Sequence, residues 1–131
     1  MKLISSKVHG LLDYISVVVL ALSPQLFGMR FYPGALSYAL ACVHFVLTFF
    51  TDFEFGFVRM IPLRIHGAIE VSVSVVLLLV AGLFAFQHDA TAFYFYATFA
   101  LFLFFVWLFS SYKIAPVSQH NKLREDKNIA A

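Results

Sequence analysis

The 131-residue chain has few charged residues and a single cysteine. Charged side chains make up 12% of it, whereas soluble globular domains carry about 25%, so too little charge is present to cover a water-soluble globule. Because Cys42 is alone, an intrachain disulfide, a CxxC redox pair and a thiolate metal cluster are excluded. The nine basic residues follow no single stripe, which excludes a nucleic-acid partner.

The common catalytic motifs are also missing. The chain contains no HExxH helix, no phosphate-binding glycine loop and no pairing of a nucleophile with a base. We therefore predict no catalytic residues, and the balance of these absences favours a protein that is not an enzyme.

Long apolar runs are what the chain has in abundance. Hydrophobic residues make up 62% of it and the mean hydropathy is +0.88. Runs of about 20 apolar residues match the roughly 30 Å hydrocarbon core of a bilayer. We predict an all-α fold, a four-helix transmembrane bundle that occupies residues 1–116, followed by a polar cytoplasmic tail at 117–131. The expected helices lie at about 8–27, 34–50 (after a Pro33–Gly34 turn), 62–86 and 90–112.

Basic residues predict the orientation, since lysine and arginine accumulate on the cytoplasmic side of a membrane. Threading four helices places eight basic residues on one side and only Arg30 on the other. The eight are Lys2, Lys7, Arg59, Arg64, Lys113, Lys122, Arg124 and Lys127. We expect a multi-pass protein of the cell inner membrane, with both termini in the cytoplasm and the lipid bilayer as its main partner.

An internal repeat is visible at an offset of 57 residues, with one copy at about 3–56 and the second at about 60–112. The first and third helices match well, whereas the second and fourth match poorly. Two helices separate the copies, so both copies enter the membrane in the same direction. The repeat therefore predicts two parallel hairpins related by an approximate two-fold axis along the membrane normal.

The repeat carries a polar motif, His-Gly-x-x-Asp/Glu, inside otherwise apolar helices. It pairs His9 with Asp13 and His66 with Glu70. The i,i+4 spacing places each histidine and its acid on one helix face, and the glycine after each histidine allows close approach. If the first and third helices face each other, all four polar groups meet at one depth, where ionisable residues are costly.

We interpret this cluster first as a structural lock, in which each histidine donates to a carboxylate and the two hairpins are held together. A bound metal or haem is the alternative, because two histidines and two carboxylates suit Zn, Mn or Fe and two opposed histidines can ligate haem iron. That alternative implies a redox-linked protein. A proton-coupled transport subunit or a small-ligand pocket is a further possibility.

Three other residues are candidates for function. His44 lies in the second helix outside the repeat, and it becomes a ligand candidate if it points at the cluster. Lys7 and Arg64 occupy equivalent places before the two histidines, where they are expected to contact lipid phosphates or to collect an anion. Four short helices enclose little interior, so a homodimer is a reasonable expectation.

Several segments resemble the SPW-repeat family of small bacterial membrane proteins. They are VHGLLDY at 8–14, LSPQLFG at 22–28, TDFEFG at 51–56 and IPLRIH at 61–66. The resemblance covers roughly residues 3–86 and includes the duplication, although Gln25 stands where the family has tryptophan. It implies the two-hairpin topology and the importance of the His/acid motif, and it implies no particular activity.

Overall fold

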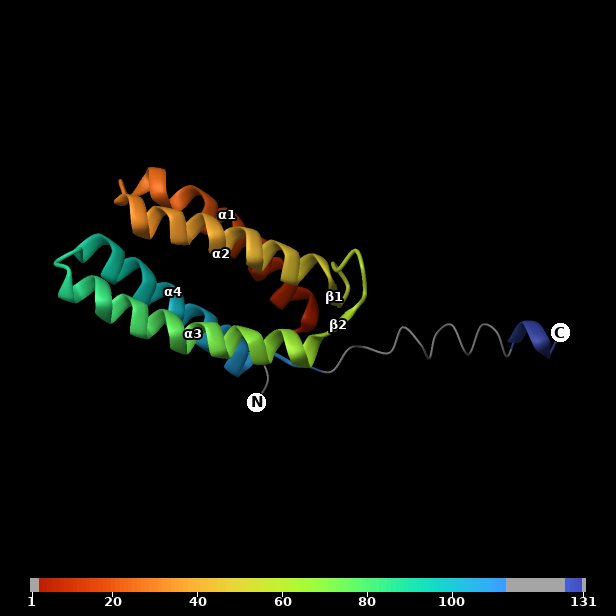
Figure 1. Ribbon diagram of the computed structural model, residues 1–131. Coiled ribbons are helices and arrows are strands. Elements are labelled where there is room, and N and C mark those ends of the chain that lie inside the picture. Colours follow the sequence, from red (N-terminus) through yellow and green to blue (C-terminus); the bar gives the residue numbers. More distant parts are fainter. Residues whose placement is uncertain (1–2, 113–126, 131) are drawn as a thin grey trace.

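Four long helices joined as two hairpins make up the computed structural model, which describes residues 3–112 and 127–130 (Figure 1). Helices α1 (Ser6–Leu26) and α2 (Phe31–Phe49) form the first hairpin, and α3 (Leu63–Phe86) and α4 (Ala90–Phe109) form the second. Each helix is long and apolar enough to cross a membrane. The predicted all-α four-helix transmembrane bundle is confirmed; most of the predicted tail lies outside the described residues.

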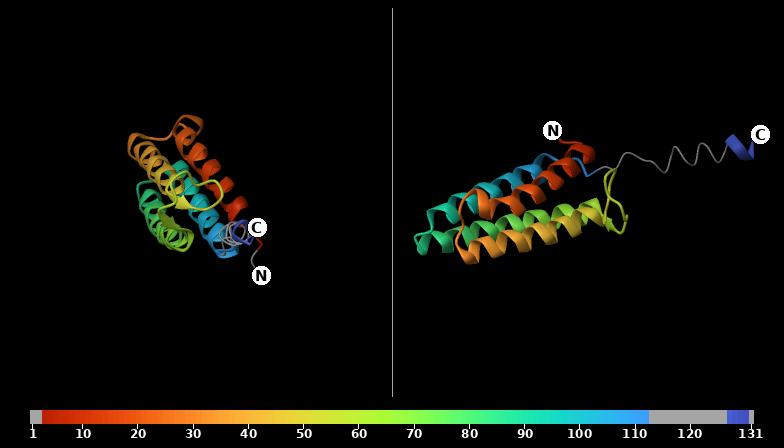
Figure 2. Two further views of the ribbon diagram at one scale, coloured as in Figure 1. Left: turned by 90° about the vertical axis from the view of Figure 1, so that its right-hand side faces the viewer. Right: turned by 90° about the horizontal axis from the view of Figure 1, so that it is seen from above.

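The two hairpins stack face to face. Figures 1 and 2 together show α1 beside α4 and α2 beside α3, so that α1 and α3 stand diagonally across the bundle. The closest backbone packing is within each hairpin. Buried side chains of all four helices meet at the centre of the bundle, and α1 and α3 face each other across it.

Three helix ends differ from the sequence-based prediction. Helix α1 begins two residues earlier, at Ser6, because the Ser5 hydroxyl caps it by accepting from the Val8 N–H. Helix α2 begins at Phe31 and carries Pro33 in its first turn, where the missing proline N–H would be unpaired in any case. The predicted turn at Pro33–Gly34 is therefore wrong. Helix α4 ends at Phe109 instead of residue 112, since the chain leaves the helix to pair with the N-terminal segment.

A proline inside α1 is accommodated by the serine before it. Pro24 has no N–H to donate, which deprives the Leu20 carbonyl of its helical partner. The Ser23 hydroxyl donates to that carbonyl at 2.9 Å. The Ser-Pro pair therefore satisfies its own hydrogen bonds in a part of the helix that water does not reach.

Two short strands join the end of the first hairpin to the start of the second. Strand β1 (Thr51–Asp52) lies parallel to β2 (Ile61–Pro62), with Thr51 opposite Ile61. The Phe50 carbonyl accepts from the backbone N–H groups of Met60 (3.1 Å) and Ile61 (2.9 Å). This pairing places the residue after α2 beside the residue that leads into α3.

The other ends of the hairpins pair in the same way. Ile4 and Ser110 form a parallel bridge, and the Phe109 carbonyl accepts from the N–H groups of Leu3 (2.9 Å) and Ile4 (3.0 Å). Each hairpin thus begins against the end of the other. At this end of the bundle the start of each hairpin therefore pairs with the end of the other hairpin. We call these paired segments the exchanged ends, and the polar cluster lies next to them in the bundle interior.

Candidate metal centre

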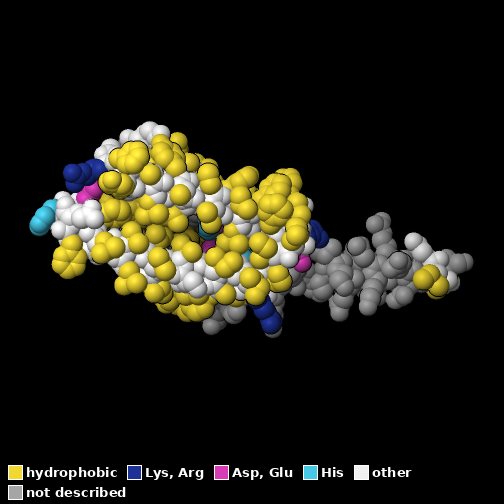
Figure 3. Space-filling view, viewed as in Figure 1, with side chains coloured by type: hydrophobic (Ala, Val, Ile, Leu, Met, Phe, Trp, Pro, Cys, Tyr) yellow, Lys and Arg dark blue, Asp and Glu magenta, His cyan; other side chains and the backbone are white. Residues whose placement is uncertain are grey.

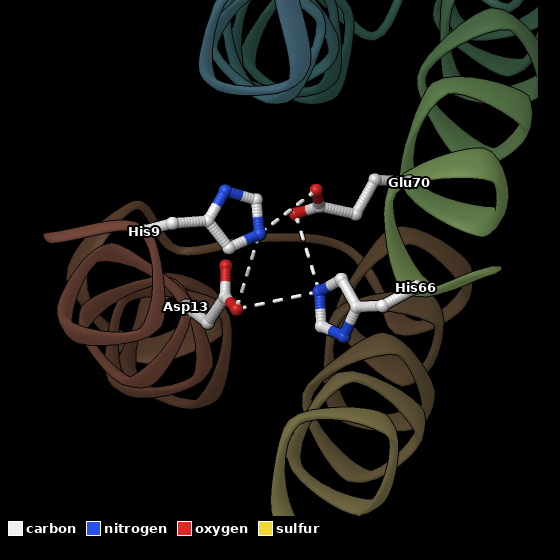
Figure 4. Close-up of side chains that lie close together, drawn as sticks. All are labelled: His9, Asp13, His66 and Glu70. Atoms are coloured by element: carbon white, nitrogen blue, oxygen red, sulfur yellow. Dashed lines mark ion pairs between the residues drawn. The ribbon is translucent and has the colours of Figure 1, made fainter. Parts of the chain in front are cut away.

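Four ionisable side chains meet between α1 and α3. His9 and Asp13 project from α1, and His66 and Glu70 project from α3 into the same space (Figure 4). None of the four is more than 2% exposed. The structure therefore brings together the four residues of the duplicated motif, as its spacing predicted.

The histidines and the acids alternate around the cluster. His9 Nε2 lies 3.5 Å from an Asp13 oxygen and 3.2 Å from a Glu70 oxygen, and His66 Nε2 lies 3.3 Å and 3.7 Å from the same two carboxylates (Figure 4). Charge-assisted hydrogen bonds are shorter, at about 2.7–2.9 Å. Within the described residues, both Nε2 atoms, one Asp13 oxygen and both Glu70 oxygens lack a hydrogen-bond partner.

These spacings match the separation of ligand atoms around a metal ion. Metal–ligand distances of about 2.0–2.1 Å in a tetrahedral site separate neighbouring ligand atoms by roughly 3.3–3.4 Å. One ligand atom from each of the four residues lies within 4.8 Å of the others. Two neutral imidazoles and two carboxylates also carry two negative charges, which one divalent cation balances.

Hydroxyl groups orient both imidazole rings. The Ser110 hydroxyl donates to the Val106 carbonyl at 2.6 Å, so its oxygen accepts from His9 Nδ1 at 2.7 Å. A hydroxyl has one proton to give, and it is already given to the carbonyl. His9 therefore carries a proton on Nδ1, and in the neutral ring the Nε2 lone pair faces the cluster.

His66 is held in the same manner from the first hairpin. The Thr51 hydroxyl donates to the Leu47 carbonyl at 2.6 Å and accepts from His66 Nδ1 at 2.8 Å. Histidine ligands in metal sites commonly donate their second nitrogen to such an outer partner, which fixes the tautomer and the ring. Both hydrogen bonds run between hairpins, because Ser110 follows α4 and Thr51 follows α2.

Aromatic rings cover the glycine beside each histidine. A Cβ atom at Gly10 would overlap the Phe53 ring, and one at Gly67 would overlap the Tyr112 ring. The glycines were expected to admit a neighbouring helix, but they admit rings from the segments that follow the hairpins. Burial of the Tyr112 hydroxyl, together with the Glu70 and Asp13 carboxylates, raises its pKa above the usual value of 10.

The other predicted site residues lie in two different settings. His44 points at the cluster from α2, with its Nε2 atom 3.8 Å from an Asp13 oxygen. Lys7 and Arg64 are exposed beside the helix starts and do not join the cluster, as expected for groups that contact lipid phosphates.

Thr51 and Ser110 are the residues that sequence reasoning missed. The sequence does contain a signal for them, which is a repeat at a second offset. TDF at 51–53 and SSY at 110–112 stand 59 residues apart, whereas the two histidines of the motif stand 57 residues apart.

Comparison of the chain with family models, with curated proteins and with solved structures found no match.

Proposed function

We propose that the protein is an integral membrane metal-binding protein that holds one divalent transition-metal ion between its two hairpins. The ligands are His9, Asp13, His66 and Glu70. The observation that carries this proposal is that their ligand atoms converge at 3.2–3.7 Å without hydrogen-bonding one another. Imidazole and carboxylate together suit Zn²⁺, Mn²⁺ or Fe²⁺.

The outer contacts support the same proposal. Each Nε2 lone pair faces the cluster because Nδ1 donates to a hydroxyl of the opposite hairpin. A metal ion would satisfy the buried carboxylate oxygens that have no other partner among the described residues, and unsatisfied buried charge is costly in a membrane.

Haem fits this arrangement poorly. Asp13 and Glu70 place their oxygens between the two imidazoles, in the space that a porphyrin ring would need. The site has room for an ion held by the four side chains, and the redox-linked alternative is therefore retained only for a metal ion.

The structural lock is the second candidate, and one observation favours it. Both imidazole–hydroxyl hydrogen bonds join one hairpin to the other, so the cluster ties the hairpins together whether or not an ion is bound. In this form each imidazole carries a proton on both nitrogens, and the negative charges of Asp13 and Glu70 balance the two positive rings.

Metal analysis of the purified protein separates the two candidates. We expect about one Zn²⁺, Mn²⁺ or Fe²⁺ per chain after loading with each metal alone, and loss of that metal in Asp13→Asn and Glu70→Gln because a neutral amide is a poor ligand. Asp89→Asn is the matched control, since Asp89 is a buried acid outside the cluster whose side chain caps α4 by accepting from the Ala92 N–H. A chelator should lower the melting temperature of the parent and of the control but not of the two amide variants.

The opposite pattern supports the lock. If the parent binds none of the three ions, and both amide variants melt at or above the parent temperature, the buried charges are unnecessary and the metal proposal fails.

We also propose that the chain arose by duplication of one hairpin and that it belongs to the SPW-repeat family. The support is the pairwise correspondence of contacts: Ile4 with Ser110 repeats as Ile61 with Thr51. For orientation, we propose the inner membrane with both termini in the cytoplasm. Arg59 and Arg64 lie near the exchanged ends of the hairpins, and Arg30 lies near the α1–α2 turn.

A further inference from the structure

The two halves of the bundle differ at one position beside the cluster. Buried positions of α2 and α4, and of the residues that follow these helices, correspond at the offset of 59 residues. Ala41 corresponds to Ala100, and beyond the helices Thr51 corresponds to Ser110. At this offset His44 of α2 corresponds to Leu103 of α4, and both are buried. The cluster therefore has an apolar side toward α4 and a polar side toward α2.

On the polar side, two buried side-chain atoms lack a hydrogen-bond partner within residues 3–112 and 127–130. His44 is 9% exposed, and its Nε2 atom has no hydrogen-bond partner among the described residues. Its nearest charged neighbour is the Asp13 carboxylate at 3.8 Å, beyond hydrogen-bond distance. One helical turn further on, the fully buried Thr48 hydroxyl also lacks a partner in the described chain.

A small cavity opens beside His44. It encloses about 30 Å³, lies between α2 and α3, and is lined by His44, Glu70 and apolar side chains of all four helices. Figure 3 shows the hollow between the hairpins, with histidine and acidic side chains at its base. A water molecule needs about 10–15 Å³ in this measure, so the cavity of about 30 Å³ has room for one or two water molecules or for a diatomic molecule.

Charge and surroundings restrict what can enter. The four ligands and one divalent ion sum to zero, so an anion would add uncompensated charge inside the membrane. The lining residues that are exposed or half-buried, among them Leu40, Val43 and Val73, are apolar and form the mouth of the cavity. An apolar mouth favours a solute that dissolves in lipid.

We propose that this cavity is the binding position for a small uncharged ligand of the metal ion, of the class of water, dioxygen or nitric oxide, with His44 Nε2 as its hydrogen-bond partner. The inference rests on the metal site proposed above. It makes α2 the side from which the metal ion is approached, and it explains why a histidine stands where the other hairpin has leucine.

Nitric oxide is the probe that tests this assignment. The parent is loaded with Fe²⁺ in detergent, and nitric oxide binding is followed by the electron paramagnetic resonance signal of a ferrous nitrosyl centre. We expect the signal in the parent, and an affinity about tenfold lower in His44→Leu because one hydrogen bond to the ligand is lost. The leucine copies the residue found at position 103, and His88→Asn, in the α3–α4 turn, is the control with parental affinity.

A second variant tests the route without touching the hydrogen bond. Val43→Phe places a larger side chain at the lipid-exposed mouth, and we expect slower association of nitric oxide with unchanged iron content. If His44→Leu does not fold, the association rate in Val43→Phe still tests whether nitric oxide enters through this cavity.

The outcomes are distinct. A parent that binds none of Zn²⁺, Mn²⁺ and Fe²⁺ overturns the metal site itself. A parent that binds another of these ions but no Fe²⁺ overturns the ligand position alone. Bound iron with no nitrosyl signal, or with equal affinity and equal association rates in both variants, overturns the ligand position alone. Loss of iron from His44→Leu overturns it too, because His44 would then be a ligand of the metal.

Discussion

Thr51 and Ser110 occupy equivalent positions 59 residues apart, and each accepts the Nδ1–H of the histidine in the opposite hairpin. Each also donates to the backbone carbonyl four residues earlier, at 2.6 Å. This relay fixes which imidazole nitrogen faces the cluster, and two small hydroxyl side chains thereby decide whether it can bind a cation.

Removal of these hydroxyls should weaken metal binding without unfolding the bundle. We expect Thr51→Val and Ser110→Ala each to lower the affinity for Zn²⁺ by about 10- to 100-fold, as for other outer-sphere partners of histidine ligands. Ser72→Ala is the matched control, because the Ser72 hydroxyl makes the same bond to a carbonyl four residues earlier with no histidine on it. Competition with a chelating dye measures the affinities, and equal values for all three variants would contradict the relay.

The glycines beside the histidines should not tolerate a side chain. Gly10→Ala would push against the Phe53 ring, and Gly67→Ala against the Tyr112 ring. We expect each to be destabilised by about 1–3 kcal/mol, the usual cost of overpacking. Thermal unfolding in detergent measures this.

Gly82→Ala in α3 provides the comparison. A Cβ atom there meets nothing within 4 Å, so alanine should be neutral or stabilise the helix by up to about 1 kcal/mol. The steric argument fails if Gly10→Ala melts like Gly82→Ala.

Tyr112 should make the protein sensitive to alkali. The pKa of its hydroxyl is raised in the folded state, first by burial and then by the carboxylates of Glu70 and Asp13. The folded state therefore holds this proton more tightly than the unfolded state. Stability from this source is complete below about pH 10 and falls above it, by about 1.4 kcal/mol per pH unit.

The comparison is with Tyr112→Phe, which cannot titrate. Melting temperatures of both proteins recorded between about pH 9 and 11.5 should diverge, with the parent falling more steeply. Parallel curves would show that Tyr112 loses its proton equally easily in the folded and unfolded states.

The membrane orientation can be tested with reporter fusions. We expect fusions at residues 57 and 125 to report the cytoplasm, and fusions near residues 30 and 88 to report the opposite side. A fusion at residue 57 that reports the far side of the membrane would contradict the threading of four helices and would move Arg59 and Arg64 to the wrong side.

Helix count and the central cluster were predictable because both depend on local patterns. Apolar length predicts a span, and i,i+4 spacing predicts a shared face. The hydrogen bonds of Thr51 and Ser110 to the histidines were not predictable from a repeat aligned at the single offset of 57 residues. Helix α3 is three residues longer than α1, and the α3–α4 loop is one residue shorter than the α1–α2 loop, so the offset changes from 57 to 59 after the first helix of each hairpin.

Helix ends were predicted less well because remote contacts decide them. Helix α4 stops at Phe109 since Ser110 pairs with Ile4, over 100 residues earlier in the chain. His44 could be named as a candidate from its residue type alone. Its direction toward Asp13 depends on how α2 packs against α1 within the first hairpin, which the local pattern of α2 alone does not predict.

The exchange of hairpin ends has a consequence for biosynthesis. A ribosome adds about 5–20 residues per second, so roughly 3–11 s separate the synthesis of Asp13 from that of Glu70, and Ser110 follows later still. During this interval α1 must reside in or near the bilayer without α3. The i,i+4 spacing that gives each helix both a histidine and an acid allows His9 and Asp13 to neutralise each other while they wait. The histidine and the acid of one helix can therefore pair with each other first, and they gain the histidine and the acid of the other helix once that helix has entered the membrane.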